Sequence, residues 1–93
     1  MVSNSRAAVR ESSKIRNDVK KLVAQIARMD SRKVKESASI RDDLGIDSLA
    51  AMEILASIEK RLDIVIDEAK AFDVVTLKDL LDLVMEYLRK KKK

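Results

Sequence analysis

The sequence lacks several residue types that particular classes of protein require. It contains no cysteine and no histidine, which excludes disulfides, a thiol nucleophile, an imidazole base and the nitrogen and sulfur ligands of zinc. It has no proline, one glycine and only two aromatic residues, Phe72 and Tyr87. Strand-rich folds need turn residues and favour aromatic side chains. The composition therefore predicts a helical protein.

Long apolar runs are also missing. No stretch approaches the roughly 20 apolar residues that cross a bilayer, and the N-terminus has no signal-peptide core. We therefore expect no transmembrane segment and a cytoplasmic location. A chain of 93 residues forms one small domain, here residues 1–93, and we expect a monomer.

Charge divides the chain into three parts behind a net charge of +4. Residues 1–35 hold ten basic and three acidic residues, for a charge of +7, whereas residues 36–88 hold five basic and thirteen acidic residues, for −8. Residues 89–93 add +5. Such asymmetry carries information about partners rather than about fold. We expect residues 1–11 and 89–93 to be flexible basic termini around an acidic middle.

Apolar periodicity predicts three longer helices. The first starts at Ser12 or Ser13 and ends near Met29 or Asp30. Residues 30–47 then form a long connection, and its expected anchors in the core are Val34, Ile40, Leu44 and Ile46.

The second helix is expected over about Ser48–Arg61. Its expected core stripe contains Leu49, Met52, Leu55 or Ala56, Ile58 or Glu59, and Leu62. Further apolar residues widen its surface beyond one face, and we expect these to be partly exposed: Ala50, Ala51, Ile54 and Ala56.

A short helix is expected near Glu68–Phe72, and Thr76 is expected to cap the last helix with Asp79 in the capping-box position. The last helix has the cleanest apolar stripe, made of Leu77, Leu80, Leu81, Val84, Met85 and Leu88. The fold class is therefore all-α, a small four-helix bundle of three longer helices and one short third helix with a long first loop.

The residues before the second helix form the most informative stretch. Asp47 is a good N-cap, and Gly45 allows a positive φ in the turn that leads to the helix. The hydroxyl of Ser48 then lies beside the positive end of a helix, which favours a bound phosphate. An isolated Asp-Ser-Leu would simply cap a helix.

The run Asp43-Leu44-Gly45-Ile46-Asp47-Ser48-Leu49, with Glu53 four residues on, resembles the attachment site of acyl carrier proteins. The resemblance extends over about Ile15–Leu88. It implies a covalent 4′-phosphopantetheine on Ser48, flanked by Asp47 and Leu49, whose thiol carries acyl groups as thioesters. It also implies a protein that is not an enzyme and that serves fatty-acid, lipid or polyketide-type synthesis. The implied partners are a phosphopantetheinyl transferase and acyl-transferring or condensing enzymes.

The resemblance also implies a docking surface and a pocket for the acyl chain. The residues expected to meet partner enzymes are Asp47, Met52, Glu53, Ile54, Glu59 and Glu68. The residues expected to line the pocket are Met52, Ile58, Ile66, Ala71 and Val74. Aliphatic residues at such spacing are usually plain core, so the pocket depends on the resemblance.

Two departures from the family pattern suggest a specialised rather than a housekeeping member. Ala50 follows the Asp-Ser-Leu triplet where an acidic residue is common, and Asp67 precedes the short helix where proline is common. The basic first helix is a third departure from the strongly acidic housekeeping carriers.

Alternative functions are a peptidyl or other aminoacyl carrier, a helical interaction module and a nucleic-acid-binding module. The basic flanks raise the last of these, but no aromatic platform or recognition-helix pattern supports it. We expect no metal site. Asp42–Glu53 has the length of an EF-hand loop, but Leu44 and Ile46 stand at its third and fifth positions and Asp47 stands where it needs glycine.

Overall fold

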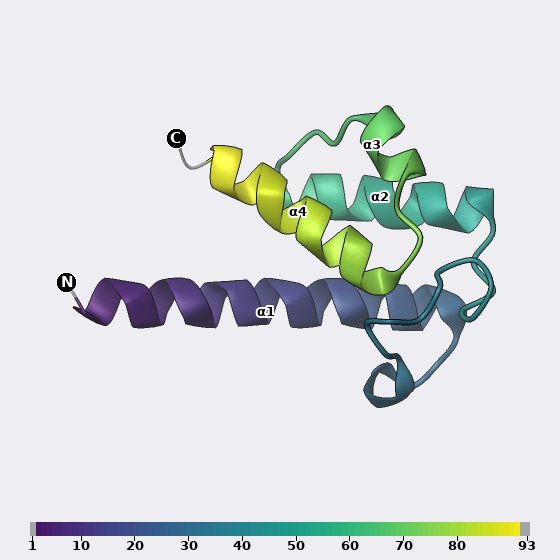
Figure 1. Cartoon of the computed structure of the whole chain (residues 1–93), viewed down its shortest axis with the longest axis horizontal. Coiled ribbons are helices and arrows are strands. Elements are labelled where there is room, and N and C mark those ends of the chain that lie inside the picture. The colour runs from purple at the N-terminus through teal and green to yellow at the C-terminus, as the bar shows by residue number, and fades with distance from the viewer. Residues whose placement is uncertain (1, 92–93) are drawn as a thin grey trace.

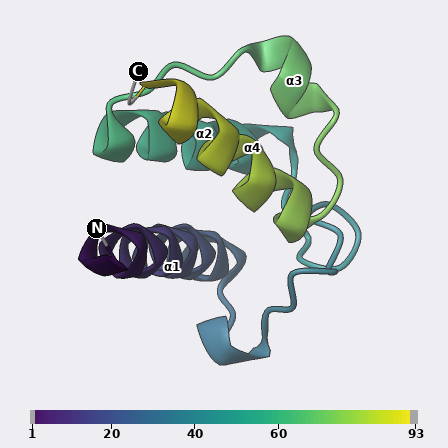
Figure 2. The same cartoon turned by 60° about the vertical axis from the view of Figure 1, so that its left-hand side comes forward.

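The computed structural model describes residues 2–91. Its elements are α1 (Val2–Ala27), the 3₁₀ turn η1 (Ser31–Lys33), α2 (Ser48–Leu62), α3 (Glu68–Phe72) and α4 (Leu77–Lys91). Figures 1 and 2 show α1 running along one side of the molecule, with α2 and α4 packed above it and the short α3 on the outer side. The all-α bundle with three longer helices, a short third helix and a long first loop is confirmed.

α1 differs from the sequence prediction at both ends. It begins at Val2 rather than at Ser12 or Ser13, because the preceding residues include no proline or glycine that would stop a helix from continuing. It ends at Ala27, where Arg28 takes a φ of 59° and the N–H of Met29 donates to the carbonyl of Ala24 at 2.9 Å. This left-handed cap ends the helix before the predicted Met29 or Asp30.

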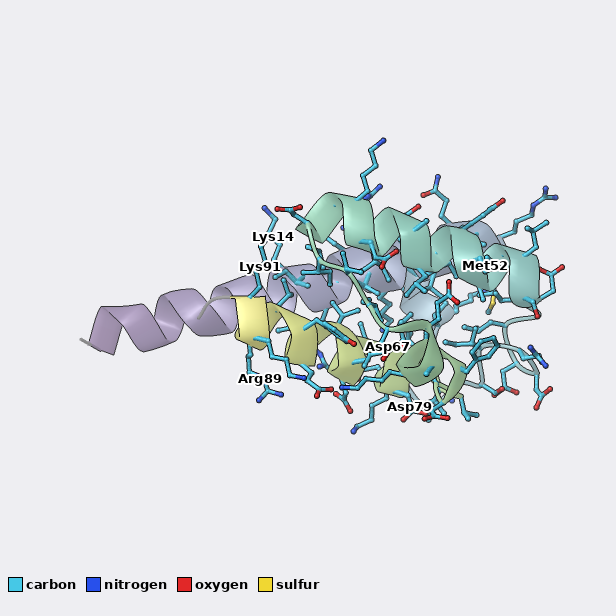
Figure 3. The ribbon with its side chains drawn as sticks, turned by 90° about the horizontal axis from the view of Figure 1, so that it is seen from above. Lys14, Met52, Asp67, Asp79, Arg89 and Lys91 are labelled. Atoms are coloured by element: carbon cyan, nitrogen blue, oxygen red, sulfur yellow. The ribbon has the colours of Figure 1, made fainter. Side chains whose placement is uncertain are left out.

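The structure describes most of the two termini that were expected to be flexible. Residues 2–11 and 89–91 are helical, whereas residues 1, 92 and 93 lie outside the described residues. At the end of α4 the ammonium of Lys91 donates to the carbonyl of Leu62 at 3.0 Å (Figure 3) and lies 3.3 Å from the carboxylate of Asp63. The last turn of α4 therefore stabilises the C-terminal end of α2.

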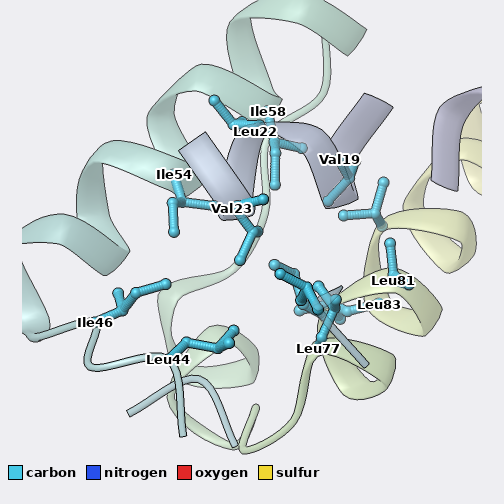
Figure 4. Close-up of a cluster of buried hydrophobic side chains, with 14 of the residues drawn as sticks. Val19, Leu22, Val23, Leu44, Ile46, Ile54, Ile58, Leu77, Leu81 and Leu83 are labelled. Atoms are coloured by element: carbon cyan, nitrogen blue, oxygen red, sulfur yellow. The ribbon is translucent and has the colours of Figure 1, made fainter. Parts of the chain in front are cut away.

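The core lies between α1, α2 and α4 and is closed at one end by the long loop (Figure 4). Of the loop anchors predicted from the sequence, Val34, Leu44 and Ile46 are buried and Ile40 is partly buried. These anchors explain how a connection of this length stays ordered, since each one removes apolar surface from water. The buried residues that Figure 4 labels are Val19, Leu22, Val23, Leu44, Ile46, Ile54, Ile58, Leu77, Leu81 and Leu83.

The predicted core stripe of α2 is wrong at its first two positions. Leu49 is 70% exposed and Met52 is 64% exposed, whereas Ile54 and Ile58 are buried. Apolar residues surround much of this helix, so periodicity alone did not fix which face turns inward. The prediction that Ile54 is exposed is therefore also wrong.

The capping box of α4 is confirmed. The N–H of Asp79 donates to Oγ1 of Thr76 at 3.1 Å, and the N–H groups of Thr76 and Val75 donate to the carboxylate of Asp79, each at 3.1 Å. The hydrogen bonds from Thr76 and Val75 lower the pKa of Asp79 below its usual value of 3.8.

The long loop supplies further partners to the start of α4. The N–H of Leu77 donates to the carbonyl of Ala38 at 3.0 Å, and that of Lys78 donates to the carbonyl of Glu36 at 2.8 Å. The N–H groups in the first turn of a helix have no partner within the helix. The loop and α4 therefore satisfy each other's polar groups, and an isolated antiparallel bridge joins Ser39 to Thr76.

Asp67 is the N-cap of α3, at the position where the family that the sequence resembles commonly has proline. Its carboxylate accepts from the N–H of Ala69 at 2.9 Å, and its own N–H donates to the hydroxyl of Tyr87 at 3.0 Å. Lys70 of α3 also lies 3.7 Å from the carboxylate of Glu86. These contacts place α3 against α4. None of the helices within residues 2–91 is long and apolar enough to cross a membrane.

Candidate functional site

The candidate site is the corner where the long loop meets α2, at the right of Figure 1. Asp47 is the N-cap of α2, and its carboxylate accepts from the N–H of Ala50 at 2.8 Å. Ser48 is the first residue of the helix and is exposed. Gly45 has a φ of 65°, the left-handed conformation that favours glycine. The Asp47 cap and the positive φ of Gly45 that the sequence predicted are both confirmed.

The loop before Ser48 is held in place by its backbone and by buried side chains. The N–H groups of Asp43 and Leu44 both donate to the carbonyl of Ser39 at 3.0 Å, and the N–H of Ile46 donates to the carbonyl of Ile40 at 3.1 Å. Leu44 and Ile46 are buried on either side of Gly45. The corner therefore presents the Ser48 hydroxyl to solvent from a fixed backbone.

A cation faces the serine, and the sequence analysis did not identify it. Nη2 of Arg41 donates to Oγ of Ser48 at 3.3 Å. The two residues are seven positions apart, across a turn, so neither helical nor strand periodicity relates them. The only available signal was a basic residue among the acidic residues that precede Ser48.

The acidic residues of the corner accept hydrogen bonds from the backbone. Oδ2 of Asp43 accepts from the N–H of Ser39 at 2.7 Å, as Asp47 does from Ala50. Within residues 2–91, no group of three acidic side chains is arranged to hold a metal ion. The acids of this corner therefore shape the turn, and Ser48 itself has no carboxylate within hydrogen-bonding distance among the described residues.

The predicted docking residues differ in their surroundings. Asp47, Met52, Glu53 and Glu68 are exposed, but Ile54 is buried in the core. Glu59 is half-buried, and its carboxylate accepts from the N–H of Ile66 at 2.8 Å. Glu59 therefore braces the segment between α2 and α3, which the sequence did not indicate.

The predicted pocket residues also separate into two groups. Ile58 and Ile66 are buried, and Ala71 and Val74 are partly buried against the same core, whereas Met52 lies on the surface of α2 (Figure 3). A depression between α3 and α4 is lined mainly by charged residues, and of the five predicted residues it includes only Val74. The pocket for an acyl chain stays a prediction.

Comparison with known proteins places this corner in a family. Residues 17–84 match the family described as "Phosphopantetheine attachment site". An acyl carrier protein of Desulforapulum autotrophicum is 42% identical over 74 residues, which cover 78% of this chain and 91% of that protein. The chain belongs to the acyl carrier protein family. An acyl carrier protein of Karelsulcia muelleri is 32% identical over 80 residues, covering 86% of this chain and 96% of the relative.

A solved structure shows the same fold. The apo doublet acyl carrier protein from prodigiosin biosynthesis matches with a TM-score of 0.67 and 25% identity over 82% of this chain. The match covers 37% of that longer chain. As a member of the acyl carrier protein family, this chain is a non-catalytic carrier that holds 4′-phosphopantetheine covalently on a serine and works with partner enzymes.

The described corner suits that cofactor. A phosphodiester is an anion, and the Ser48 hydroxyl lies at the positive end of α2 with the guanidinium of Arg41 beside it. When bound, the arm supplies the thiol that forms a thioester with the acyl group. The corner offers a hydroxyl and a positive surrounding for a phosphate.

Proposed function

We propose that Ser48 is the attachment serine and that this protein carries acyl groups as thioesters on the 4′-phosphopantetheine arm attached there. The observation that carries the proposal is the position of Ser48, exposed at the first residue of a long helix. The region that matches the family holds four other serines, and none of them begins an α-helix: Ser31, Ser37, Ser39 and Ser57.

The surroundings of Ser48 favour modification by another enzyme over a reaction of its own. The only side-chain hydrogen bond of its hydroxyl in the described residues is with Arg41, a cation that does not remove protons at neutral pH. A transferase would therefore supply the base. The Ser48 oxygen forms a bond to the phosphorus of coenzyme A that bears the pantetheine, 3′,5′-ADP leaves, and the hydroxyl proton passes to the transferase.

The test of attachment is intact mass followed by peptide mapping after incubation with coenzyme A, magnesium and a broad-specificity phosphopantetheinyl transferase. We expect one arm per chain, on Ser48. Ser48→Ala should remain unmodified, while Ser57→Ala, a matched change within the same helix, should load fully. An arm on another serine, or no arm with several transferases, contradicts the proposal.

Partner enzymes are proposed to approach the exposed side of α2 near Ser48. Leu49 and Met52 offer apolar surface there, and Glu53 is exposed with no ion pair in the described residues. Asp47 lies at the start of the helix, and Glu68 is an exposed acid at the start of α3. Acids beside the arm would attract a basic entrance, and that attraction would weaken with salt.

The comparison of Glu53→Gln with Glu59→Gln tests this docking surface. Both changes remove one carboxylate from α2, but Glu59 already accepts a hydrogen bond from the N–H of Ile66. We expect Glu53→Gln to slow transfer to a partner enzyme at low salt, with the difference from the unmodified sequence shrinking at high salt. Glu59→Gln should lower the free energy of unfolding, and it should slow transfer less than Glu53→Gln does. The opposite pattern contradicts the proposed surface.

The cargo is proposed to be an acyl group of fatty-acid, lipid or polyketide-type synthesis, handled by dedicated partners. Ala50 removes a charge that housekeeping partners commonly meet, so Ala50→Asp should raise the rate with housekeeping fatty-acid enzymes. Equal and fast rates for both proteins would contradict a specialised role.

We also propose that Ile58, Ile66, Ala71 and Val74 shelter part of the acyl chain. Each methylene removed from water contributes about 0.8 kcal/mol. The melting temperature should therefore rise as the attached chain is lengthened. A melting temperature that does not respond to chain length contradicts the pocket.

A further inference from the structure

Arg41 lies on a part of the loop whose backbone is fixed on both sides. The N–H of Ile40 donates to the carbonyl of Val75 at 2.9 Å, and its carbonyl accepts from Ile46 at 3.1 Å. On the other side, the N–H of Asp42 donates to Oγ of Ser39 at 3.1 Å. The backbone position of Arg41 is therefore set by the fold of the loop, and its side chain reaches Ser48 from there.

The guanidinium of Arg41 has acidic neighbours in sequence, yet it forms no ion pair within 4.0 Å in the part of the chain that the structure describes. Asp43 and Asp47 accept hydrogen bonds from backbone N–H groups instead. The one hydrogen bond of the Arg41 side chain among the described residues is with the neutral hydroxyl of Ser48, at 3.3 Å. A guanidinium has five N–H donors, so most of its capacity remains available.

Two groups that favour an anion thus meet at Ser48, while the carboxylate of Asp47 is engaged with the N–H of Ala50. One is Arg41, and the other is the N-terminal end of α2, which begins at that residue. A phosphate on the Ser48 oxygen would lie within reach of the guanidinium and beside the first turn of the helix, and both favour a negative charge. Arg41 therefore differs from an ordinary surface arginine, because the atom it contacts is the one to which the arm is attached.

We propose that Arg41 binds the phosphate of the phosphopantetheine arm. The proposal rests on Ser48 as the attachment serine. In a phosphodiester, the two charged oxygens are bonded to the same phosphorus as the ester oxygen, so a cation that reaches Oγ of Ser48 also reaches them. Guanidinium and phosphate form short, charge-assisted hydrogen bonds, often two in parallel. Arg41 would hold the base of the arm against the loop, and the pantetheine beyond it would remain free to extend.

The experiment compares apo and fully loaded protein for four sequences: the unmodified one, Arg41→Gln, Arg41→Lys and the control Arg61→Gln. Arg61 is an exposed arginine on α2, thirteen residues beyond Ser48 and thus about 20 Å away along the helix. The first readout is the gain in melting temperature on loading. We expect this gain to be about 2–4 °C smaller for Arg41→Gln than for the control, the size of an exposed charge contact in a domain of this length. Arg41→Lys should restore part of the difference.

The second readout is magnetic resonance of the loaded protein. The phosphorus signal should relax faster in the unmodified and control proteins than in Arg41→Gln, because a phosphate held by Arg41 tumbles with the domain. The Nε–H signal of Arg41 in the unmodified protein should shift on loading, while that of Arg61 should not. The Nε–H measurement uses only the unmodified protein, so it decides the question even if Arg41→Gln loads poorly.

The outcomes separate this inference from the proposed function. Failure of Ser48 to load in every sequence overturns both. Full loading at Ser48 with equal thermal gains, equal phosphorus relaxation and no shift of the Arg41 signal overturns only the role of Arg41 and leaves the carrier function standing.

Discussion

The orientation of α2 decides which of its side chains stabilise the protein and which remain for partners, and a matched pair of substitutions tests it. Leu49→Ala and Ile58→Ala each remove three carbon atoms from the same helix. Leu49 is 70% exposed, whereas Ile58 is 1% exposed. The two changes therefore differ in burial and hardly at all in chemistry.

The structure predicts a large difference in the free energy of unfolding. Removing a buried isoleucine side chain as far as alanine costs about 2–5 kcal/mol, because the lost transfer energy adds to the cost of a cavity. Full burial of leucine contributes about 1.5–3 kcal/mol, so Leu49, which keeps most of its contact with water, contributes about 0.5–1 kcal/mol. A domain of this length has about 5–14 kcal/mol in total. Leu49→Ala should therefore still fold, and Ile58→Ala should fold as long as the total stability exceeds its loss.

The assay is urea unfolding followed by circular dichroism, with the slope of the transition checked for each variant. With a slope of about 1 kcal/mol per molar urea, Ile58→Ala should lower the midpoint by about 2 M or more and Leu49→Ala by less than about 1 M. Equal losses, or a larger loss for Leu49→Ala, would refute the described orientation of α2 and restore the core stripe expected from the sequence.

Two further predictions concern the helix caps. Asp47→Ala should lower the free energy of unfolding by about 1 kcal/mol because the N–H of Ala50 loses its partner, while Asp47→Asn should keep most of it; equal losses in urea unfolding would contradict the cap. Because hydrogen bonds lower the pKa of folded Asp79, its stabilisation is present above the usual value of 3.8 and is lost as the pH falls through the lowered value. The melting temperatures of the unmodified protein and Asp79→Asn should therefore converge below about pH 4, and a constant difference down to pH 2 would contradict this role.

The sequence predicts best where one short-range rule determines the structure. Asp47 and Thr76 were identified as caps because each side-chain oxygen and the N–H group from which it accepts a hydrogen bond lie within three residues of each other. Gly45 was identified because few residues other than glycine adopt its positive φ. These rules also place Ser48 at the start of a helix, whereas its role as the attachment serine was inferred from the resemblance to acyl carrier proteins.

The sequence predicts poorly where distant segments decide. The inward face of α2 depends on α1 and α4, and the apolar residues around α2 were compatible with more than one orientation, which is why Leu49 and Ile54 were misassigned. The contact of Arg41 with Ser48 depends on the path of a turn. The hydrogen bond from Ile66 to Glu59 likewise depends on how the segment after α2 folds back.

The hydrogen bonds between the long loop and the start of α4 make the motion of the loop measurable by amide hydrogen exchange. The amide protons of Leu77 and Lys78 are covered by the carbonyls of Ala38 and Glu36, and at the start of a helix they have no other partner. They can exchange with solvent deuterium only when the loop moves away. The exchange rates at residues 77 and 78 therefore measure how often this part of the loop, which leads on to Ser48, separates from α4.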